Sequence, residues 1–289
     1  MQSSSQPLAP QLYLVAVPIG NLADITLRAL DVLSRVDLLA CEDTRMTARL
    51  LQAHGIERSL TAYHEHNAAR VRPKLLSALG GGKSVALVSD AGTPLVSDPG
   101  YKLVREVQEA GYEVTALPGA SAVLTALTLS GLPPDRFYFS GFLPSRSGAR
   151  RNELEALQSI PGTLVFYESP NRLAACLRDM RDVLGGYRQA AVARELTKLY
   201  EEVRRDSLEA LAEHYSQQGA PKGEIVVLVG PLSDSARAAA AEDNLDDRLR
   251  AALAESSLRD AVNRVSSESG LPRRRVYARA LELTSKSGT

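Results

Sequence analysis

Short apolar runs alternate with stretches of helical periodicity through the first half of the chain. Apolar runs of this length, bounded by turn residues, are typical of buried strands, and apolar positions three and four apart are typical of helices. The pattern predicts strands at residues 12–17, 37–41, 59–63, 85–88 and 112–117, and helices at 27–36, 46–54, 68–79, 101–110 and 122–129. Alternation at this rhythm indicates a parallel α/β sheet.

A segment rich in Gly and Pro, residues 130–136, is the best candidate for a domain boundary. Beyond it the pattern predicts strands at 137–141, 163–168, 189–194 and 223–230, and helices at 146–159, 170–184 and 207–217. Residues 233–241 are rich in Ala and Ser and are expected to form a linker or a helical spacer. We therefore expect an N-terminal α/β domain at 11–132, a second α/β domain at 133–232 and a helical tail at 243–289.

The tail shows three possible helices and no strand. Residues 257–262 and 272–277 flank Ser269-Gly270-Leu271, and a glycine-containing turn between short helices resembles a helix-turn-helix. Basic residues are concentrated locally at Arg273, Arg274 and Arg275. The tail is therefore a candidate nucleic-acid contact.

Composition fits this architecture and narrows the class of protein. Of 289 residues, 44% are hydrophobic, only 5% are aromatic and none is Trp, so the core is expected to be mainly Ala, Leu and Val. Such a core suits helices packed on a parallel sheet. The 34 basic and 34 acidic residues balance, so bulk charge predicts no polyanionic partner, although a local basic patch remains open.

Two features indicate the compartment. Cys41 and Cys176 lack the CxxC spacing and suit reduced structural thiols. The first residues carry no basic region or long apolar run, so no signal peptide is expected, and no stretch has the length of a membrane span. These observations predict a soluble cytoplasmic protein.

The polar turn after the strand at 85–88 is the most informative stretch. Residues 89–100 are crowded with Ser, Asp, Gly, Thr and Pro. Ligands of open α/β sheets bind at the carboxyl ends of the strands, and small residues let the backbone approach a ligand closely. Similar turns follow two other strands, at 18–21 and 118–121. These turns predict a ligand site, with ordinary βα loops as the alternative.

Several familiar motifs fail on inspection. Residues 80–84 resemble the end of a P-loop, but Ser77 stands where its first glycine belongs, and the run precedes a strand instead of following one. The first strand has no full GxGxxG after it. Residues 119–123 lack the closing glycine of a nucleophile elbow. His64 and His66 have no third ligand at a standard spacing, so no metal is predicted.

Seven short motifs follow one another along the chain: VPIGNL at 17–22, CEDTR at 41–45, SDAGTP at 89–94, LPGAS at 117–121, FYESP at 166–170, ARELTK at 193–198 and KGE at 222–224. In this order they resemble the tetrapyrrole methylase superfamily. Within it they are most similar to the branch that methylates the 2′-hydroxyl of a cytidine in small-subunit (16S) ribosomal RNA. Corrin-pathway members usually carry Gly-x-Gly-Pro-Gly and Gly-Asp-Pro at the first and third of these places. Both departures favour the RNA branch.

The resemblance implies a fold of two α/β domains with a cofactor cleft between them, S-adenosylmethionine as cofactor, and a homodimer. It places two groups of residues around the cofactor: Pro18, Gly20, Asp90, Ala91, Gly92, Thr93, Ser121 and Ala122 from the first domain, and Leu164, Tyr167, Leu196, Glu224 and Ile225 from the second. Leu164, Leu196 and Ile225 are also natural core positions, and this alternative stays open.

A ribose hydroxyl attacks only as its proton leaves, so a carboxylate or a neutral His within hydrogen-bond reach would assist. Glu42, Asp43, His64 and Asp90 follow predicted strands and are the candidates. Glu42 and Asp43 could equally cap the next helix, where acidic residues are favoured.

Binding of small-subunit ribosomal RNA, free or in an assembled 30S particle, would need cations and aromatic rings. A guanidinium matches phosphate oxygens, and the candidates are Arg45, Arg146, Arg150, Arg194, Lys198, Arg273, Arg274 and Arg275. Tyr13, Tyr63, Tyr138 and Tyr167 are candidates to stack a base. Solvated charges and core tyrosines are the alternatives. Two other functions stay open: a methylase of a tetrapyrrole or other small molecule, and a non-enzymatic ribosome assembly factor.

Overall fold

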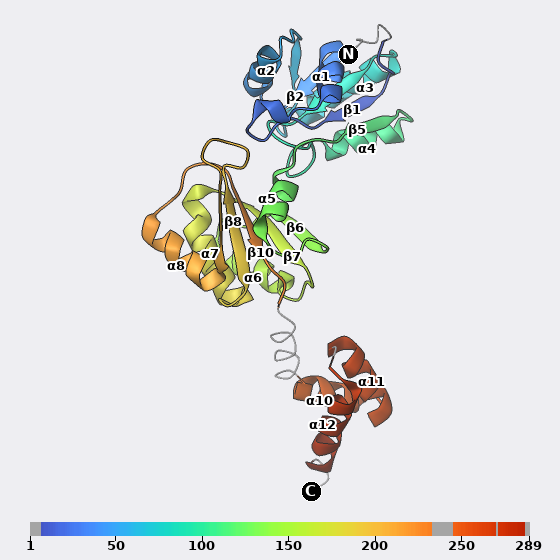
Figure 1. Cartoon of the computed structure of the whole chain (residues 1–289). Helices are drawn as coiled ribbons and strands as arrows, with labels where there is room; N and C mark the ends of the chain where they lie inside the picture. The colour runs from blue at the N-terminus through green and yellow to red at the C-terminus, as the bar shows by residue number, and fades with distance from the viewer. Residues whose placement is uncertain (1–6, 233–244, 270, 287–289) are drawn as a thin grey trace. The chain divides into compact units, whose positions relative to one another are not determined.

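The structure is a computed structural model that describes residues 7–232, 245–269 and 271–286. The chain divides into two compact units, Met1–Gly230 and Pro231–Thr289. The first unit contains two five-stranded sheets with their helices, and the second is helical (Figure 1). The fold class predicted from the sequence is confirmed. The predicted boundary at residues 132 and 133 falls between the two sheets, inside the first unit.

The first sheet is parallel throughout, with the strand order β3-β2-β4-β1-β5. Its strands are β1 Leu12–Val15, β2 Leu38–Cys41, β3 Leu60–Ala62, β4 Val85–Val88 and β5 Val114–Leu117. Every residue of β4 is buried, as expected for a central strand covered on both faces. All five predicted strands are confirmed, within a few residues at their ends.

Helices connect these strands or follow the last of them, and several begin with a side-chain cap. They are η1 Leu22–Asp24, α1 Leu27–Arg35, α2 Thr44–Ala53, α3 Ala68–Gly80, α4 Tyr101–Glu109 and α5 Ala122–Ser130. The side chains of Thr26, Asp43 and Ser121 accept hydrogen bonds from backbone N–H groups of the first turns of α1, α2 and α5. A cap of this kind stabilises a helix by about 1 kcal/mol. The sequence alternative in which Asp43 caps a helix is therefore realised.

The second sheet is mixed, with the order β6-β7-β10-β8-β9. Its strands are β6 Phe137–Phe142, β7 Thr163–Glu168, β8 Gln189–Arg194, β9 Glu202–Ser207 and β10 Ile225–Val229, and its helices are α6 Ser147–Leu157, α7 Pro170–Leu184 and α8 Leu208–Gln218. Only β6 and β7 run parallel. The sequence pattern did not predict β9, because most of its residues are charged and it contains no apolar run. It lies at the sheet edge, where charged side chains protect the open edge from further pairing.

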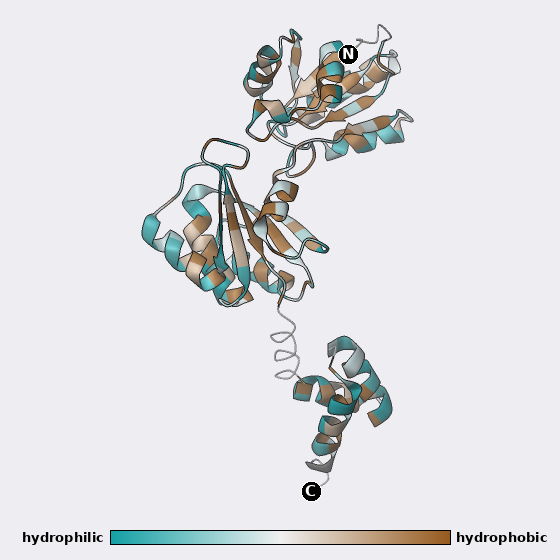
Figure 2. Cartoon of the chain, viewed as in Figure 1, coloured by the Kyte–Doolittle hydropathy of each residue, from teal (hydrophilic) through white to brown (hydrophobic). Residues whose placement is uncertain are grey.

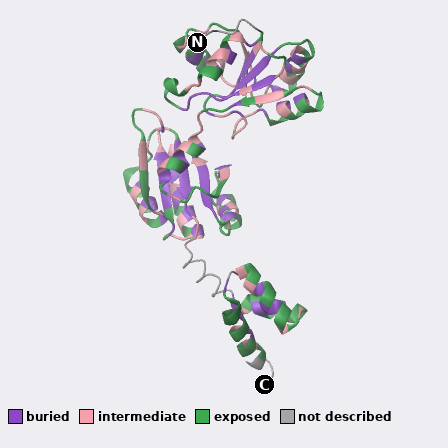
Figure 3. Ribbon diagram, turned by 45° about the vertical axis from the view of Figure 1, so that its right-hand side comes forward, coloured by how far each residue is buried: buried purple, intermediate pink, exposed green. Residues whose placement is uncertain are grey.

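Alternate residues of the second sheet enter two different cores. Leu164 and Phe166 of β7 face α6, α7 and α8, and their side chains are fully buried. Val165 and Tyr167 face the opposite side, where α5 packs on the sheet together with Ile19 from the loop after β1. Hydrophobic residues mark the central strands of both sheets in Figure 2, and these central strands are largely buried in Figure 3. Helix α5 therefore joins the first sheet to the second.

The described residues of the second unit form a bundle of three helices, α10 Leu245–Glu255, α11 Leu258–Ser269 and α12 Arg273–Lys286. Leu249, Val262 and Val276 are among the residues that form its own apolar core. The three predicted helices are confirmed, whereas Gly270 in the predicted turn and residues 243–244 lie outside the described part. No helix among the described residues is long and apolar enough to cross a membrane.

Candidate functional site

A cavity of about 390 Å³ lies in the first unit and is lined by residues from both sheets. This volume falls within the range of small-molecule sites, about 300–1,000 Å³. Three segments of the first half line it: the loop after β1, the loop after β4 and the start of α5. The ends of β6, β7, β8 and β10 and the turns beside them line it from the second half.

The floor of the cavity is made where three turns of the first sheet meet. Gly92 and Val17 exchange two backbone hydrogen bonds, with N···O distances of 2.9 and 3.0 Å. The Thr93 hydroxyl donates to the Ala120 carbonyl at 3.2 Å. These contacts tie the small-residue turns after β1, β4 and β5 together at one edge of the sheet. Gly92 has φ +71°, and a Cβ there would lie 3.3 Å from Cγ2 of Ile19.

The opposite wall is held by a cluster of charged side chains. Oε1 of Glu195 accepts from Nζ of Lys198 at 2.9 Å and from the backbone N–H of Glu224 at 3.0 Å. Nζ of Lys198 also lies 3.1 Å from Oε2 of Glu224. The Lys198 ammonium lowers the pKa of the Glu195 carboxyl. This cluster joins the turn after β8 to the turn before β10, from which Leu196 and Glu224 line the cavity.

Most of the predicted cofactor residues lie at the cavity. Those that line it are Asp90, Ala91, Gly92, Thr93, Ser121, Ala122, Tyr167, Leu196, Glu224 and Ile225. Leu164 does not line it, because it lies on the opposite face of β7 with no exposed area, so its cofactor role is wrong. Pro18 and Gly20 flank Ile19, which lines the cavity in their place. Gly20 instead packs on the turn after β8, where an added Cβ would lie 2.5 Å from Cγ of Lys198.

The carboxyl ends of β2 and β4 bring together four acidic side chains. Oδ1 of Asp90 accepts from the backbone N–H of Asp43 at 2.8 Å. Burial, followed by repulsion from Asp90, raises the pKa of Glu42. Burial also raises the pKa of Asp98, against a hydrogen bond from Ser89, and Asp90 adds to the rise. Of these four, only Asp90 and Asp98 line the cavity.

The remaining catalytic candidates are less well placed. Hydrogen bonds from Arg45, first from its side chain and then from its backbone N–H, lower the pKa of Asp43 to about 2. An Asp with so low a pKa is a poor proton acceptor at neutral pH. His64 lies at the start of the turn before α3, and its ring is 6.0 Å from that of His66. Glu42, Asp43 and His64 do not line the cavity, and the described residues contain no group of three or more metal-ligating side chains that could hold a metal ion.

The basic candidates fall into different environments. Arg150 is buried and its guanidinium binds Asp179, so the predicted phosphate contact of this residue is wrong. Arg194 pairs with Glu202, and Lys198 with Glu195 and Glu224. Arg45 is largely exposed and pairs with Asp43, and Arg146 is exposed at the start of α6. Arg273, Arg274 and Arg275 are exposed in the first turn of α12, where Nε of Arg273 donates to Asn263.

Several residues of the cavity were absent from the sequence prediction. They are Ile19, Val96, Ser97, Asp98, Phe142, Glu168, Ser169, Pro170, Gly223 and Val226. Asp98 belongs to the same polar turn as Asp90, so the sequence pattern could have predicted it as a cavity residue. Phe142 gave no signal, because an apolar residue at a strand end is expected in the core.

Replacing Gly223 with alanine tests the wall of the cavity. Gly223 has φ +102°, and an added Cβ would lie 2.4 Å from Cγ and Cδ of Glu195. The side chain of Glu195 must therefore move, which breaks its bonds to Lys198 and Glu224. We expect the affinity of the cavity for its ligand to fall at least about tenfold, which is about 1.4 kcal/mol. Calorimetric titration checks this, with Gly219→Ala as control, since Gly219 also has positive φ but no neighbour within 4 Å.

A family model described as tetrapyrrole (corrin/porphyrin) methylases matches residues 11–212. This span covers the first sheet, four of the five strands of the second sheet and most of the residues that line the cavity, whereas β10 lies beyond it. The chain belongs to the tetrapyrrole methylase family. A second model, described as the RsmI C-terminal HTH domain, matches residues 231–284, which correspond to the helical unit.

Curated relatives within the family share about half of their residues with the chain. A ribosomal RNA small subunit methyltransferase I of Mesorhizobium japonicum is 55% identical over 98% of this chain and 96% of its own length. The protein of the same name from Pseudomonas aeruginosa is 52% identical over 76% of this chain and 79% of its own. The Synechocystis protein of that name is 44% identical over 94% and 98%. The chain is therefore a methyltransferase of the branch that carries this name.

Several solved structures share the fold of the chain at low sequence identity. Diphthine synthase matches with a TM-score of 0.60 at 18% identity over 76% of this chain and 89% of its own. Cobalt precorrin-4 methyltransferase CbiF matches with 0.58 at 16% identity over 76% and 95%. A Thermus thermophilus uroporphyrin-III C-methyltransferase, complexed with S-adenosyl homocysteine, matches with 0.55 at 20% identity over 75% and 96%. The fold is thus common to methyltransferases and a synthase whose names give different substrates.

Proposed function

We propose that the chain transfers a methyl group from S-adenosylmethionine to the 2′-hydroxyl of a cytidine in small-subunit ribosomal RNA. The observation that carries the proposal is the identity of 44–55% to relatives named for that ribosomal RNA. A second observation supports it: a cavity lies at the strand ends, and most of its lining residues fall within the span that the family model matches.

The residues of the cavity fit this cofactor. Gly92 leaves a cradle that a Cβ would close against Ile19, so a ligand can approach the backbone there. Ile19, Leu196 and Ile225 offer apolar surface for adenine, and Thr93 offers a hydroxyl. Asp90 and Asp98 give the cavity negative charge, which complements a cationic sulfonium. When bound there, S-adenosylmethionine supplies a methyl group that is activated by the positive charge on sulfur.

The chain's own residues must orient the ribose and accept its proton. We assign proton acceptance to Asp98, because it lines the cavity and burial raises its pKa. A proton acceptor becomes more effective as its pKa approaches the working pH. Asp90 lies beside it and keeps the turn after β2 in place through the Asp43 N–H. Orientation of the reacting groups contributes several kcal/mol more.

Exposed arginines are suited to the RNA backbone. Arg45 and Arg146 lie on the first unit, and Arg273, Arg274 and Arg275 begin α12 of the second. Guanidinium groups match phosphate oxygens and release counterions on binding. We further propose that the substrate is the ribosomal RNA or its assembled particle, that the enzyme is cytoplasmic and that it forms a homodimer.

The test is methyl transfer from labelled S-adenosylmethionine to small-subunit particles that lack the modification. We expect label in the RNA, in a dinucleotide that resists alkali because a methylated 2′-hydroxyl cannot attack the neighbouring phosphate. Label on a base would contradict the 2′-hydroxyl. Cofactor binding without transfer to any particle would favour an assembly factor, and label on an added tetrapyrrole would favour a small-molecule methylase.

A further inference from the structure

Phe142 lies at the rim of the cavity as the outermost of three neighbouring aromatic residues. It lines the cavity although 55% of its surface is exposed. Its ring centroid is 5.5 Å from that of Tyr167, and Tyr167 is 4.9 Å from Phe139. The inner two rings are part of the core beside α5, whereas Phe142 keeps more than half of its surface for solvent. Its position next to the proposed reaction site is what a stacking surface requires.

A bulge in β6 places Phe142 on this face. Phe139 pairs with Val165 and Phe142 with Tyr167, so an extra residue in β6 separates the two pairs. Without the bulge, strand alternation would put Phe139 and Phe142 on opposite faces. Gly141 at the bulge has φ +73°, which favours glycine. A bulge re-aims a side chain, and bulges are common beside active sites.

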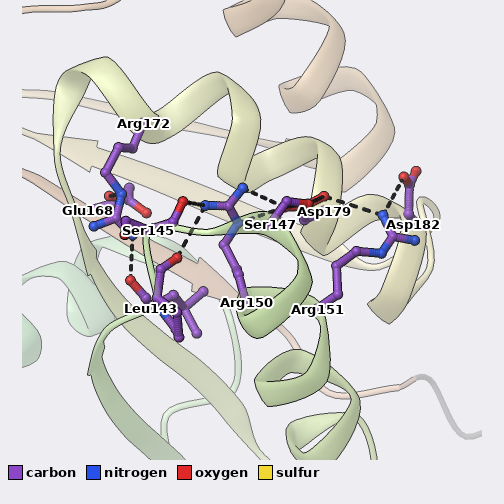
Figure 4. A network of polar contacts seen from close by, with 10 residues as sticks. Leu143, Ser145, Ser147, Arg150, Arg151, Glu168, Arg172, Asp179 and Asp182 are labelled. Carbon is purple, nitrogen blue, oxygen red and sulfur yellow. Dashed lines mark hydrogen bonds and ion pairs between the residues drawn. The ribbon is translucent and has the colours of Figure 1, made fainter.

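The loop after Phe142 is held by side chains from α6 and α7. Nη1 of Arg150 donates to the carbonyls of Pro144 and Ser145 at 3.3 and 3.2 Å. Nη2 of Arg172 donates to the carbonyl of Leu143. Figure 4 shows both arginines beside the loop. The carbonyls of three successive residues after Phe142 are thus held by hydrogen bonds from arginine side chains.

The two arginines are held in turn by buried carboxylates. Nε of Arg150 donates to Oδ2 of Asp179 at 2.7 Å, and Ser147 donates to the same carboxylate. Nε of Arg172 lies 3.2 Å from Oε1 of Glu168, whose side chain has no exposed area. Burying such pairs costs desolvation that their attraction offsets only with good geometry. Their visible effect is a loop with a fixed backbone, which carries Phe142 at its start and the exposed Arg146 further on.

We propose that Phe142 is the platform on which the target pyrimidine base stacks, and that the arginine-clamped loop positions it. This inference rests on the proposed function. Single-stranded RNA is recognised by stacking unpaired bases on aromatic rings. A base on Phe142 would lie at the cavity rim, so its ribose would be held near the carboxylates that line the cavity. Arg146 in the same loop is exposed and available to a neighbouring phosphate.

Kinetics of Phe142→Ala and Phe142→Tyr on unmodified small-subunit particles test the proposal. We expect Phe142→Ala to raise KM for the particle by about 5- to 150-fold, equivalent to about 1–3 kcal/mol per stacked base. Phe142→Tyr keeps the ring and should stay near wild type. Phe142 also lines the cofactor cavity, so Phe142→Ala should lower affinity for S-adenosylmethionine, measured by calorimetry, by a much smaller factor than it raises KM for the particle. Phe137→Ala is the matched control, because Phe137 is exposed on the same strand but is not among the residues lining the cavity.

Three other outcomes would contradict either the stacking platform or the proposed function. Wild-type kinetics in Phe142→Ala would overturn the platform while leaving the proposed function in place. An equal loss of cofactor affinity in Phe142→Ala would make Phe142 a wall of the cofactor site and also overturn the platform. Absence of methyl transfer by the wild-type enzyme would overturn the proposed function, and the inference with it. A cross-link from a photoreactive pyrimidine in the RNA to Phe142 supports the platform independently of turnover.

Discussion

Replacing Arg150 with alanine is expected to lower the free energy of unfolding by about 3–5 kcal/mol, the usual cost of breaking a buried ion pair. Arg150 and Asp179 have side chains only 4% and 10% exposed, and their closest N···O distance is 2.5 Å. Without the guanidinium, Asp179 stays buried with a charge. Nη1 of Arg151 lies 3.3 Å from Oδ1 of Asp179 and remains in the variant, so the loss of stability should be about 3 kcal/mol. Urea unfolding measures the effect.

Two companion variants separate charge from packing. Arg151→Ala should cost less than about 1 kcal/mol, because this guanidinium is more exposed and such pairs contribute little. The double variant Arg150→Met with Asp179→Leu removes both charges and should recover much of the loss, since apolar replacements of buried pairs are often neutral. An Arg150→Ala protein as stable as the wild type would contradict the buried pair as a determinant of stability.

The same variants connect stability to the RNA site. Arg150→Met/Asp179→Leu frees the carbonyls of Pro144 and Ser145 while the core stays filled. If the clamp positions Phe142, this variant should raise KM for the particle even where its stability approaches that of the wild type. Affinity for the cofactor should change little, because neither Arg150 nor Asp179 is among the residues lining the cavity.

The elements of the first sheet could be predicted because their sequences repeat a single rule. The strands β1, β2 and β4 are short, mostly buried apolar runs and the helices α1, α2 and α4 are amphipathic, so pattern and burial agree. β9 broke the rule, since four of its six residues are charged, and it pairs with only one neighbour, β8, at the sheet edge. Its backbone pairing with β8 shows that it is a strand, and this pairing cannot be read from the sequence pattern. Similarly, Arg150 looked like any other cation until burial beside Asp179 gave it a structural role.

The sequence predicted the cavity residues that lie in backbone turns better than those whose side chains project from strands. The small-residue turns around Gly92 and Ser121 converge because parallel strands end at one edge. Leu164 and Leu196 looked alike in the sequence, yet one lies in the helix-covered core and the other at the cavity. The face of β7 on which Leu164 lies depends on register. Phe142 was missed for a related reason, because the bulge at Gly141 reverses the alternation.

Replacing Asp98 with asparagine is expected to lower kcat by about 100- to 10,000-fold, the usual contribution of a positioned general base. Asparagine keeps the size of the side chain but cannot accept the proton. Affinity for S-adenosylmethionine should fall by less than about tenfold, or 1.4 kcal/mol, because Asp90 still gives the cavity negative charge. Single-turnover rates with labelled cofactor and calorimetry measure the two quantities separately.

The pH dependence gives Asp98 a signature of its own. Burial, and then the charge of Asp90, raise its pKa above the ordinary value of 3.8. The wild-type rate should therefore rise with pH through that raised pKa, as the carboxylate forms. Stability should change in the opposite direction: the folded state holds the proton more tightly than the unfolded chain, so the free energy of unfolding falls as pH rises through the same window. Asp98→Asn should lose both dependences.

Asp90→Asn decides between the two carboxylates of the cavity. Its amide oxygen can still accept from the Asp43 N–H, so the turn should keep its shape. Removing the negative charge relieves repulsion on Asp98, which should move the acid limb of the rate toward lower pH while much of kcat remains. If Asp90→Asn instead removes turnover and Asp98→Asn keeps it, the proton acceptor is Asp90. In that case the exposed carboxylate of Asp90 accepts the ribose proton, and the raised pKa of Asp98 is a consequence of its burial with no role in the reaction.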